Sequence, residues 1–288
     1  MGRPPFQLAL TLSYDGSDFF GSQVQPGRRT VQDELERALA ALYGAPCPVV
    51  FAGRTDRGVH AAGQVVSLPD PRSDLEPATV RAALNARLPT DLVVVAARRR
   101  PFRFNARYDA RWREYRYRIW SGGHEPLAAR QVWMRSARLD LAAMARAAML
   151  LHGEHDFASF AGGGEGVPWS PRQAQPRGTR RTLFASEVRR LTPWWRGEGA
   201  GELFEYRVVG DGFLPQMVRA LISAVAEVGR GTRPTSWIAD LLEAKDRRAG
   251  AGTAPPSGLT LWQVGYEAFG SAPAQAGAPA AAASNAEE

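Results

Sequence analysis

The residues best suited to chemistry form one short stretch, Gly53-Arg54-Thr55-Asp56-Arg57-Gly58-Val59-His60. One carboxylate, Asp56, stands between two arginines, and nearby guanidiniums favour the ionised form of an acid. An ionised, positioned carboxylate acts as a nucleophile or as a general base. The flanking glycines allow a tight turn or the close approach of a ligand. The stretch is either an active-site loop with a lone catalytic aspartate or a polar surface turn with a local ion pair.

Strands and helices alternate around this stretch. Apolar side chains at every second position predict a half-buried strand over residues 6–14. Thr30, with Asp33 three residues later, forms a capping-box-like start for a helix whose apolar stripe runs from Val31 to Leu42. We expect further strands over 64–68, 92–97, 113–119, 204–208 and 259–266, and further helices over 139–151, 213–228 and 237–244.

Three side chains on these elements have two interpretations each. Tyr115 and Tyr117 share one face of their strand, because alternate side chains of a strand point the same way. They are either a core aromatic pair or a wall that a substrate stacks against. Arg219 lies one residue from the apolar stripe of its helix, where it needs an acidic partner unless it reaches solvent at the rim.

The charge balance indicates a polyanionic partner. The chain has a net charge of +7, and residues 1–267 carry +9 because the remainder holds only Glu287 and Glu288 as charged residues. Lys245 is the only lysine, and arginine suits RNA because its planar guanidinium binds phosphate bidentately and stacks on bases. The high proportion of arginine also has a second explanation, because the base composition of a genome can favour arginine without any functional demand. The run from Arg98 to Arg103 is the best candidate for contact with a nucleic-acid backbone.

Several other classes of protein are disfavoured. No apolar run of membrane-spanning length and no signal peptide stand out, and the single Cys47 fits a reducing compartment, so we expect a cytoplasmic protein that contacts no membrane. His152, His155 and Asp156 are too few ligands for a zinc site. A glycosidase needs paired carboxylates, and the Gly-rich loop of nucleotide-driven enzymes is missing.

The stretch over 53–61 resembles the active-site loop of the tRNA pseudouridine synthase A family, Gly-Arg-Thr-Asp-Ala-Gly-Val-His-Ala, with Arg57 in the place of an alanine. The resemblance continues in order over roughly residues 6 to 267. Its further matches include Tyr14-Asp15-Gly16, Phe19-Phe20-Gly21, Gln64-Val65, Ala106-Arg107-Tyr108, Tyr115-Arg116-Tyr117, Gly212-Phe213-Leu214, Met217-Val218-Arg219 and Ala254-Pro255.

The resemblance assigns roles to individual side chains. Asp56 becomes the nucleophile or proton-abstracting group, Tyr115 the active-site tyrosine, and Arg219 the partner that holds the Asp56 carboxylate. The implied substrate-binding residues are Arg54, Arg57, Tyr115, Tyr117, Gln64 and Arg107. Arg57 is expected to point outward, and His60 to close the loop through hydrogen bonds without taking part in catalysis.

The resemblance also implies an α+β fold of two related domains. Each has a mainly antiparallel sheet with flanking helices, and a basic cleft lies between them. We place the N-terminal domain, with the aspartate loop, over residues 1–109 and the C-terminal domain over 110–268. Residues 161–180 are a long connection rich in glycine and proline. It is either an RNA-contacting flap with Arg172, Arg177, Arg180 and Arg181 or a passive linker. Residues 269–288 form an Ala/Pro-rich tail expected to be disordered.

The implied activity is that of an isomerase, a tRNA pseudouridine(38-40) synthase that converts uridines 38, 39 and 40 of the anticodon stem-loop without a metal, a redox cofactor or a nucleotide cofactor. A homodimer binding tRNA is expected, and the alternative is a non-catalytic RNA-binding protein on the same fold. Three departures from the family pattern bear on RNA docking: Ser22 where tryptophan is frequent, Asn105 where histidine is usual, and Pro215-Gln216 where an aromatic-His pair is usual.

Overall fold

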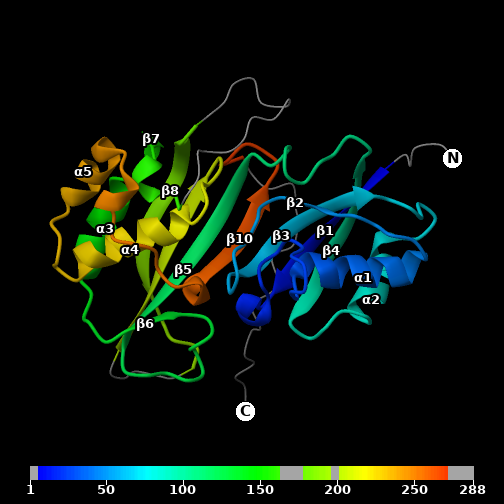
Figure 1. The fold of residues 1–288 in the computed structure, drawn as a ribbon, viewed down its shortest axis with the longest axis horizontal. Helices are drawn as coiled ribbons and strands as arrows, with labels where there is room; N and C mark the ends of the chain where they lie inside the picture. Colours follow the sequence, from blue (N-terminus) through cyan, green and yellow to red (C-terminus); the bar gives the residue numbers. More distant parts are fainter. Residues whose placement is uncertain (1–5, 163–177, 196–200, 272–288) are drawn as a thin grey trace, which may run out of the picture.

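The computed structural model describes residues 6–162, 178–195 and 201–271 (Figure 1). Most of the predicted connection over 161–180 and of the predicted tail over 269–288 lies outside these residues. Arg180 and Arg181 fall inside them, in a strand.

The N-terminal half contains, in order, β1 (Phe6–Tyr14), η1 (Gly16–Asp18), α1 (Val31–Tyr43), β2 (Val50–Phe51), β3 (His60–Pro69), α2 (Pro77–Asn85) and β4 (Leu92–Pro101). The C-terminal half contains β5 (Trp112–Gly122), β6 (Trp133–Arg135), α3 (Leu141–Met149), β7 (Gly153–Asp156), η2 (Ala158–Phe160), β8 (Arg180–Leu191), β9 (Gly201–Gly210), α4 (Met217–Gly229), α5 (Trp237–Ala244), η3 (Arg247–Ala249), η4 (Pro256–Gly258) and β10 (Leu259–Gly265).

In the described part of the chain, ten strands form one mixed sheet. Its order is β4-β1-β3-β10-β5-β9-β8-β7, with β2 paired to β3 and β6 paired to β5. Pairing is antiparallel except between β10 and β3 and between β5 and β6. With its flanking helices this architecture confirms the α+β class (Figure 1).

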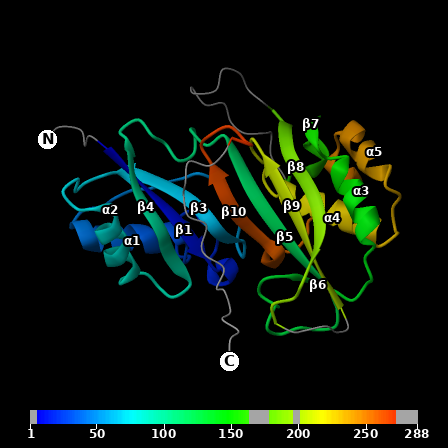
Figure 2. The ribbon, with the colours of Figure 1, turned by 180° about the vertical axis from the view of Figure 1, so that it is seen from behind.

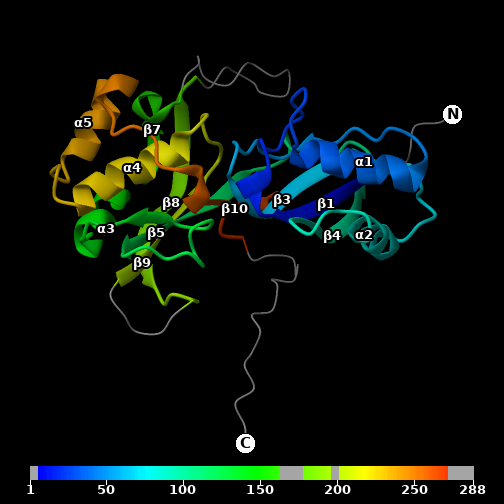
Figure 3. The same cartoon turned by 60° about the horizontal axis from the view of Figure 1, so that its bottom comes forward.

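The last strand joins the two halves. β10 pairs with β3 on one side and with β5 on the other, so the strands of both halves form a continuous sheet (Figure 2). The predicted division between residues 109 and 110 falls in the connection from β4 to β5 and stays a prediction. Figure 3 shows α1 and α4 on the same side of the strands, one over each half.

The apolar patterns explain how these helices pack. The Thr30 side chain accepts a hydrogen bond from the Asp33 amide at 3.3 Å, which confirms the predicted cap of α1. Leu35 and Leu39 of α1 are fully buried in the same core cluster as Leu10 of β1. Among the described helices, α4 is the most completely covered, with 11 of its 13 residues buried, as expected for a helix between a sheet and other helices.

The predicted start of α4 was wrong by four residues. The apolar pair Phe213 and Leu214 suggested a helix from 213, but α4 begins at Met217. The backbone of Gln216 is left-handed, with φ of 57°, and a right-handed helix cannot pass through that conformation. The helix α2 and the strand β8 are further elements that the apolar pattern did not indicate.

Candidate active site

The stretch over 53–59 lies in the connection from β2 to β3, and His60 is the first residue of β3. The start of this loop is fixed by a side chain of β3. The Gln64 side chain of β3 accepts a hydrogen bond from the Gly53 amide at 3.3 Å and donates one to the Gly53 carbonyl at 2.8 Å. Gln64 is fully buried, with both amide atoms occupied by the backbone of the loop. The structure therefore places this expected substrate-binding residue behind the loop, as its anchor.

The tip of the loop is a tight turn. The Val59 amide donates to the Asp56 carbonyl at 3.1 Å, and Gly58 takes the left-handed conformation with φ of 79°. Hydrogen bonds made by Thr55 hold this turn in place. Its amide donates to Ser22 Oγ at 3.0 Å, its carbonyl accepts from the Ser22 amide at 3.0 Å, and its hydroxyl lies 2.8 Å from that of Tyr14. The Asp56 side chain therefore projects from a rigid base.

The cation that pairs with Asp56 comes from the other half of the chain. Arg219 Nη1 lies 3.2 Å from Asp56 Oδ2, and Arg219 Nε donates to the Ala254 carbonyl at 2.7 Å. The Arg219 side chain is 15% exposed and that of Asp56 46%. This confirms the expected partnership and resolves the two interpretations of Arg219, because a mostly buried guanidinium has found its acid. The expectation that Arg54 and Arg57 hold Asp56 was wrong, since neither pairs with its carboxylate among the described residues.

A cavity of about 500 Å³ opens above this ion pair. It is lined by Phe20, Gly21, Ser22, Gln23, Gln25, Arg54, Thr55, Asp56, Arg57, Gln216, Arg219 and Pro256. Both halves of the chain contribute, and Asp56 is the only carboxylate in the described lining. The volume lies within the range of roughly 300–1,000 Å³ that is usual for ligand sites.

Two of the expected RNA-binding arginines border this cavity. Arg54 is exposed at its edge. Arg57 lies over the ring of Phe20, with its guanidinium carbon 4.3 Å from the ring centroid. Arg57 is exposed on the cavity wall, and its expected outward orientation toward RNA stays a prediction. Cations on aromatic faces of this kind are attracted by the ring electrons.

Tyr115 and Tyr117 share a face of β5 but differ in environment. Tyr115 is buried with the edge of its ring against Phe213, at a centroid distance of 5.0 Å. Burial raises the pKa of Tyr115 above its usual value, and the negative charge of Asp56 adds to the increase. Tyr117 is fully buried, and its hydroxyl donates to the Pro255 carbonyl at 2.7 Å. Neither tyrosine is among the residues that line the cavity. Tyr115 lies behind the start of the aspartate loop, and Tyr117 stays in the core.

Arg107 also lies outside the cavity lining. Its carbonyl accepts a hydrogen bond from Arg113 Nη2 at 2.9 Å, and the same nitrogen donates to the Ala52 carbonyl at 2.8 Å. Arg113, from the strand that carries Tyr115, thereby holds the start of the aspartate loop. Arg113 begins the strand that was predicted over 113–119, but sequence reasoning gave it no role.

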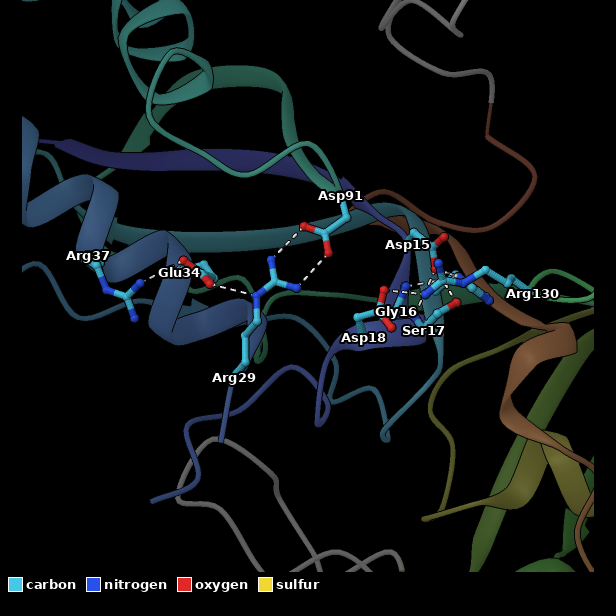
Figure 4. Close-up of polar contacts among 10 residues, drawn as sticks. Asp15, Gly16, Ser17, Asp18, Arg29, Glu34, Arg37, Asp91 and Arg130 are labelled. Atoms are coloured by element: carbon cyan, nitrogen blue, oxygen red, sulfur yellow. Dashed lines mark hydrogen bonds and ion pairs between the residues drawn. The ribbon is translucent and has the colours of Figure 1, made fainter. Parts of the chain in front are cut away.

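The segment over 20–30 forms one wall of the cavity through Phe20, Gly21, Ser22, Gln23 and Gln25, and ion pairs fix its far end. Arg29 donates from two nitrogens to the two carboxylate oxygens of Asp91, at 2.7 and 2.8 Å, and from Nε to Glu34 at 2.9 Å (Figure 4). Two-pronged pairs of this kind fix geometry as well as charge. The same view shows Arg130, from the C-terminal half, bonded to Asp18 of η1.

His60 closes the loop through hydrogen bonds, as predicted. The Gly16 amide lies 3.0 Å from Nδ1, and Asp15 Oδ1 lies 3.2 Å from the same nitrogen. The other nitrogen, Nε2, donates to the Ser257 carbonyl at 3.2 Å. His60 therefore joins the end of the loop to the segment before β10.

Other kinds of site find little support in the ranges that the structure covers. There, no group of three or more His, Cys, Asp and Glu side chains is arranged to hold a metal ion. Nor does any helix in those ranges have the length and apolarity needed to cross a bilayer.

Comparison with known proteins agrees with this geometry. The tRNA pseudouridine synthase family matches residues 11–109 and 147–267. A tRNA pseudouridine synthase A from Geobacillus kaustophilus is 40% identical over 264 residues, covering 91% of this chain and 95% of the relative. Those from Solidesulfovibrio magneticus and Bacillus subtilis are 44% and 39% identical, and cover 92% and 91% of this chain and 92% and 99% of their own lengths. This chain therefore belongs to the tRNA pseudouridine synthase family.

Proposed function

We propose that this protein isomerises uridine to pseudouridine at positions 38, 39 and 40 of the tRNA anticodon stem-loop, with Asp56 as the nucleophile. The observation that carries the proposal is the Asp56–Arg219 ion pair, which closes the floor of a cavity built by both halves of the chain. Membership of the family supports the reaction, and the geometry supports Asp56 as the reacting group.

The chemistry requires one nucleophile and a pocket. The C1′–N1 bond of the nucleoside must break, the uracil must rotate, and a new C1′–C5 bond must form while the C5 proton leaves. Asp56 is the only carboxylate in the described cavity lining, which disfavours glycoside hydrolysis by a pair of acids. Arg219 fixes the direction of the carboxylate, because its guanidinium is held in turn by the Ala254 carbonyl.

Tyr115 is proposed to carry the C5 proton. Its raised pKa keeps the phenol protonated at neutral pH, so we propose a relay in place of a phenolate base: the hydroxyl oxygen takes up the C5 proton while its own O–H proton passes to solvent. Its hydroxyl lies beneath the start of the aspartate loop, where a side chain at Gly53 would meet it at 3.6 Å. Burial is the main cause of the raised pKa of Tyr115, and the negative charge of Asp56 makes a smaller contribution in the same direction.

The arginines at the rim are proposed to hold the RNA. Arg54 is exposed at the cavity edge, and Arg57 on the Phe20 ring adds a cation beside an aromatic face. A base that leaves its stack loses a few kcal/mol, which contacts of this kind offset. Arg107 and the run over 98–103 lie outside the cavity lining and are proposed to contact the tRNA backbone further away. A homodimer in the cytoplasm is proposed on the family resemblance.

The variant Asp56→Asn tests the proposal. It keeps the size of the side chain and removes the nucleophilic charge. Release of tritium from tRNA labelled at uridine C5 should fall below detection, while tRNA binding changes by no more than a few-fold. Asp18→Asn is the matched control, because Asp18 is an exposed acid that also pairs with an arginine across the two halves but does not line the cavity.

Substantial tritium release by Asp56→Asn would refute the nucleophile assignment. Activity of the wild-type protein on tRNA with uridine only outside positions 38, 39 and 40 would refute the proposed positions. If the wild-type protein binds tRNA but releases no tritium from any uridine, it is a non-catalytic RNA-binding protein. Mapping of pseudouridine in tRNA from cells that lack the protein gives the same distinctions in vivo.

A further inference from the structure

We propose that Gln216 is a substrate-binding residue whose side-chain amide donates a hydrogen bond to a carbonyl oxygen of the target uracil. The inference rests on the proposed function and adds to it a group that recognises the base. Gln216 stands where the chain departs from its family pattern, and no role followed from its sequence position.

The backbone at Gln216 adopts a conformation that is costly for this residue. The Met217 amide donates to the Leu214 carbonyl at 3.1 Å, with Pro215 and Gln216 at the two central positions of the turn. Gln216 has φ of 57° and ψ of 4°, at a turn position that glycine or asparagine usually occupies. A side chain retained in a disfavoured conformation beside an active site is an indication of function.

The orientation of the Gln216 amide is set by its neighbours. Arg247 Nη2 donates to Thr253 Oγ1 at 2.8 Å, which leaves the threonine hydroxyl proton to donate to Gln216 Oε1 at 3.4 Å. The oxygen of the amide is thus engaged on the side of Thr253. The Nε2 group, which carries two protons, has no hydrogen-bond partner among the described residues.

Packing keeps the side chain at this place. The Gly162 amide donates to the Pro215 carbonyl at 2.7 Å, so the segment before residue 163 lies directly on the turn. A Cβ atom at Gly162 would come within 2.6 Å of Gln216 Cβ and Oε1, which shows how closely the side chain lies against this backbone. Gln216 is exposed, but its side chain thus lies against Gly162 on one side and Thr253 on another.

Gln216, which carries this free N–H donor, lines the cavity of the candidate active site. Gln216 lines the same cavity as Asp56 and Arg219, and it precedes Arg219 by three residues, about one helical turn. Uracil offers two carbonyl oxygens as acceptors, and an amide N–H satisfies one of them without adding charge beside Asp56. A glutamine on the facing wall is not equivalent, because Gln25 Nε2 is already bonded to the Phe20 carbonyl at 2.6 Å.

Gln216→Gly is the first test, because it should separate stability from activity. Glycine adopts a left-handed backbone without strain, so the melting temperature should rise or stay unchanged. Loss of the donor should lower kcat/KM for tRNA by about tenfold, the size of one hydrogen bond. Gln216→His should keep kcat/KM within about threefold, since the ring retains an N–H donor and histidine tolerates this backbone better than most residues.

Anticodon stem-loops with 2-thiouridine or 4-thiouridine at the target position identify the contact, because sulfur accepts hydrogen bonds more weakly than oxygen. One of the two should slow the wild-type enzyme, and the same substitution should have no added effect on Gln216→Gly. Equal slowing of both proteins, or no slowing of the wild type, would overturn the inference, as would full kcat/KM in Gln216→Gly. Inactivity of the wild type toward every stem-loop would instead refute the proposed function.

Discussion

Substitution of Gly21 by alanine tests whether the wall over residues 20–30 sets the position of the aspartate loop. Gly21 has φ of 99°, and a Cβ atom there would lie 2.9 Å from the Thr55 carbonyl oxygen. Ordinary contact begins at 3.4 Å, so the loop must move by about 0.5 Å. Because Thr55 directly precedes Asp56, the movement passes to the carboxylate.

The size of the effect follows from that displacement. A catalytic group that is misplaced by about 1 Å lowers the rate by about a hundredfold. A displacement of the Asp56 carboxylate by about half that distance should therefore lower the single-turnover rate by about tenfold. The left-handed backbone adds a stability cost of roughly 1–2 kcal/mol for alanine, a loss of several degrees in melting temperature for a protein of this size. The rate is measured by tritium release with enzyme in excess, which removes any effect on tRNA affinity.

Gly27→Ala is the matched control. Gly27 lies in the same segment with φ of 67°, and a Cβ atom there would meet nothing within 4 Å. It should therefore lose stability through the same backbone strain and keep the single-turnover rate. Equal rates for both variants, whether reduced or normal, would show that the contact between Gly21 and Thr55 does not position Asp56.

Four further outcomes are expected. Arg219→Lys keeps the charge but cannot bond both Asp56 and the Ala254 carbonyl as the guanidinium does, so kcat should fall by about ten- to a hundredfold, the value of one charge-assisted hydrogen bond, while the Kd for tRNA stays unchanged. Tyr115→Phe should lower kcat far more than tRNA affinity, and a change in affinity alone would leave only a stacking role for the ring. Burial raises the pKa of Tyr14 and Tyr43 to about 12. Since unfolded tyrosines ionise near pH 10, their contribution to stability is complete below pH 10 and is lost as the pH rises from about 10 to 12, which urea unfolding midpoints from pH 8 to 11.5 will detect. The Kd for tRNA should rise steeply with salt, and a flat response would contradict phosphate contacts by the arginines.

The sequence predicted the elements whose signals are local. Alternating apolar residues identified β1, and the Thr30 cap identified the start of α1, because each signal depends on neighbours within one or two turns. The predicted start of α4 was wrong because the apolar pattern there is also a local signal. Phe213 and Leu214 extend the apolar pattern, but the turn through Pro215 and Gln216 breaks the backbone before the helix begins.

Contacts between distant segments could not be derived from residue patterns. The position of β10 between β3 and β5 brings together strands about 200 and 140 residues apart in the chain, and no local pattern specifies that register. The family resemblance, and not spacing, identified Asp56 and Arg219 as partners. Spacing alone favoured Arg54 and Arg57, which are nearer in sequence but do not reach the carboxylate.

Equivalent positions in a pattern also acquired different roles in the structure. Tyr115 and Tyr117 alternate on one face of β5, yet the Tyr117 hydroxyl is bonded to the Pro255 carbonyl and the Tyr115 hydroxyl to no group among the described residues. Gln64 was expected at the substrate and is a buried anchor of the loop. These differences depend on which polar partner each side chain meets, and only the three-dimensional arrangement determines that.

The segment over 254–257, just before β10, explains why the site depends on the joining of the two halves. Its backbone carbonyls accept hydrogen bonds from Arg219 Nε at residue 254, from the Tyr117 hydroxyl at residue 255 and from His60 at residue 257. Pro256 lines the cavity itself. β10 follows this segment in the chain and pairs with strands of both halves. The strand that joins the two halves therefore also fixes the positions of these carbonyl groups. The ion pair at Asp56 is thus positioned by the same backbone that makes the sheet continuous.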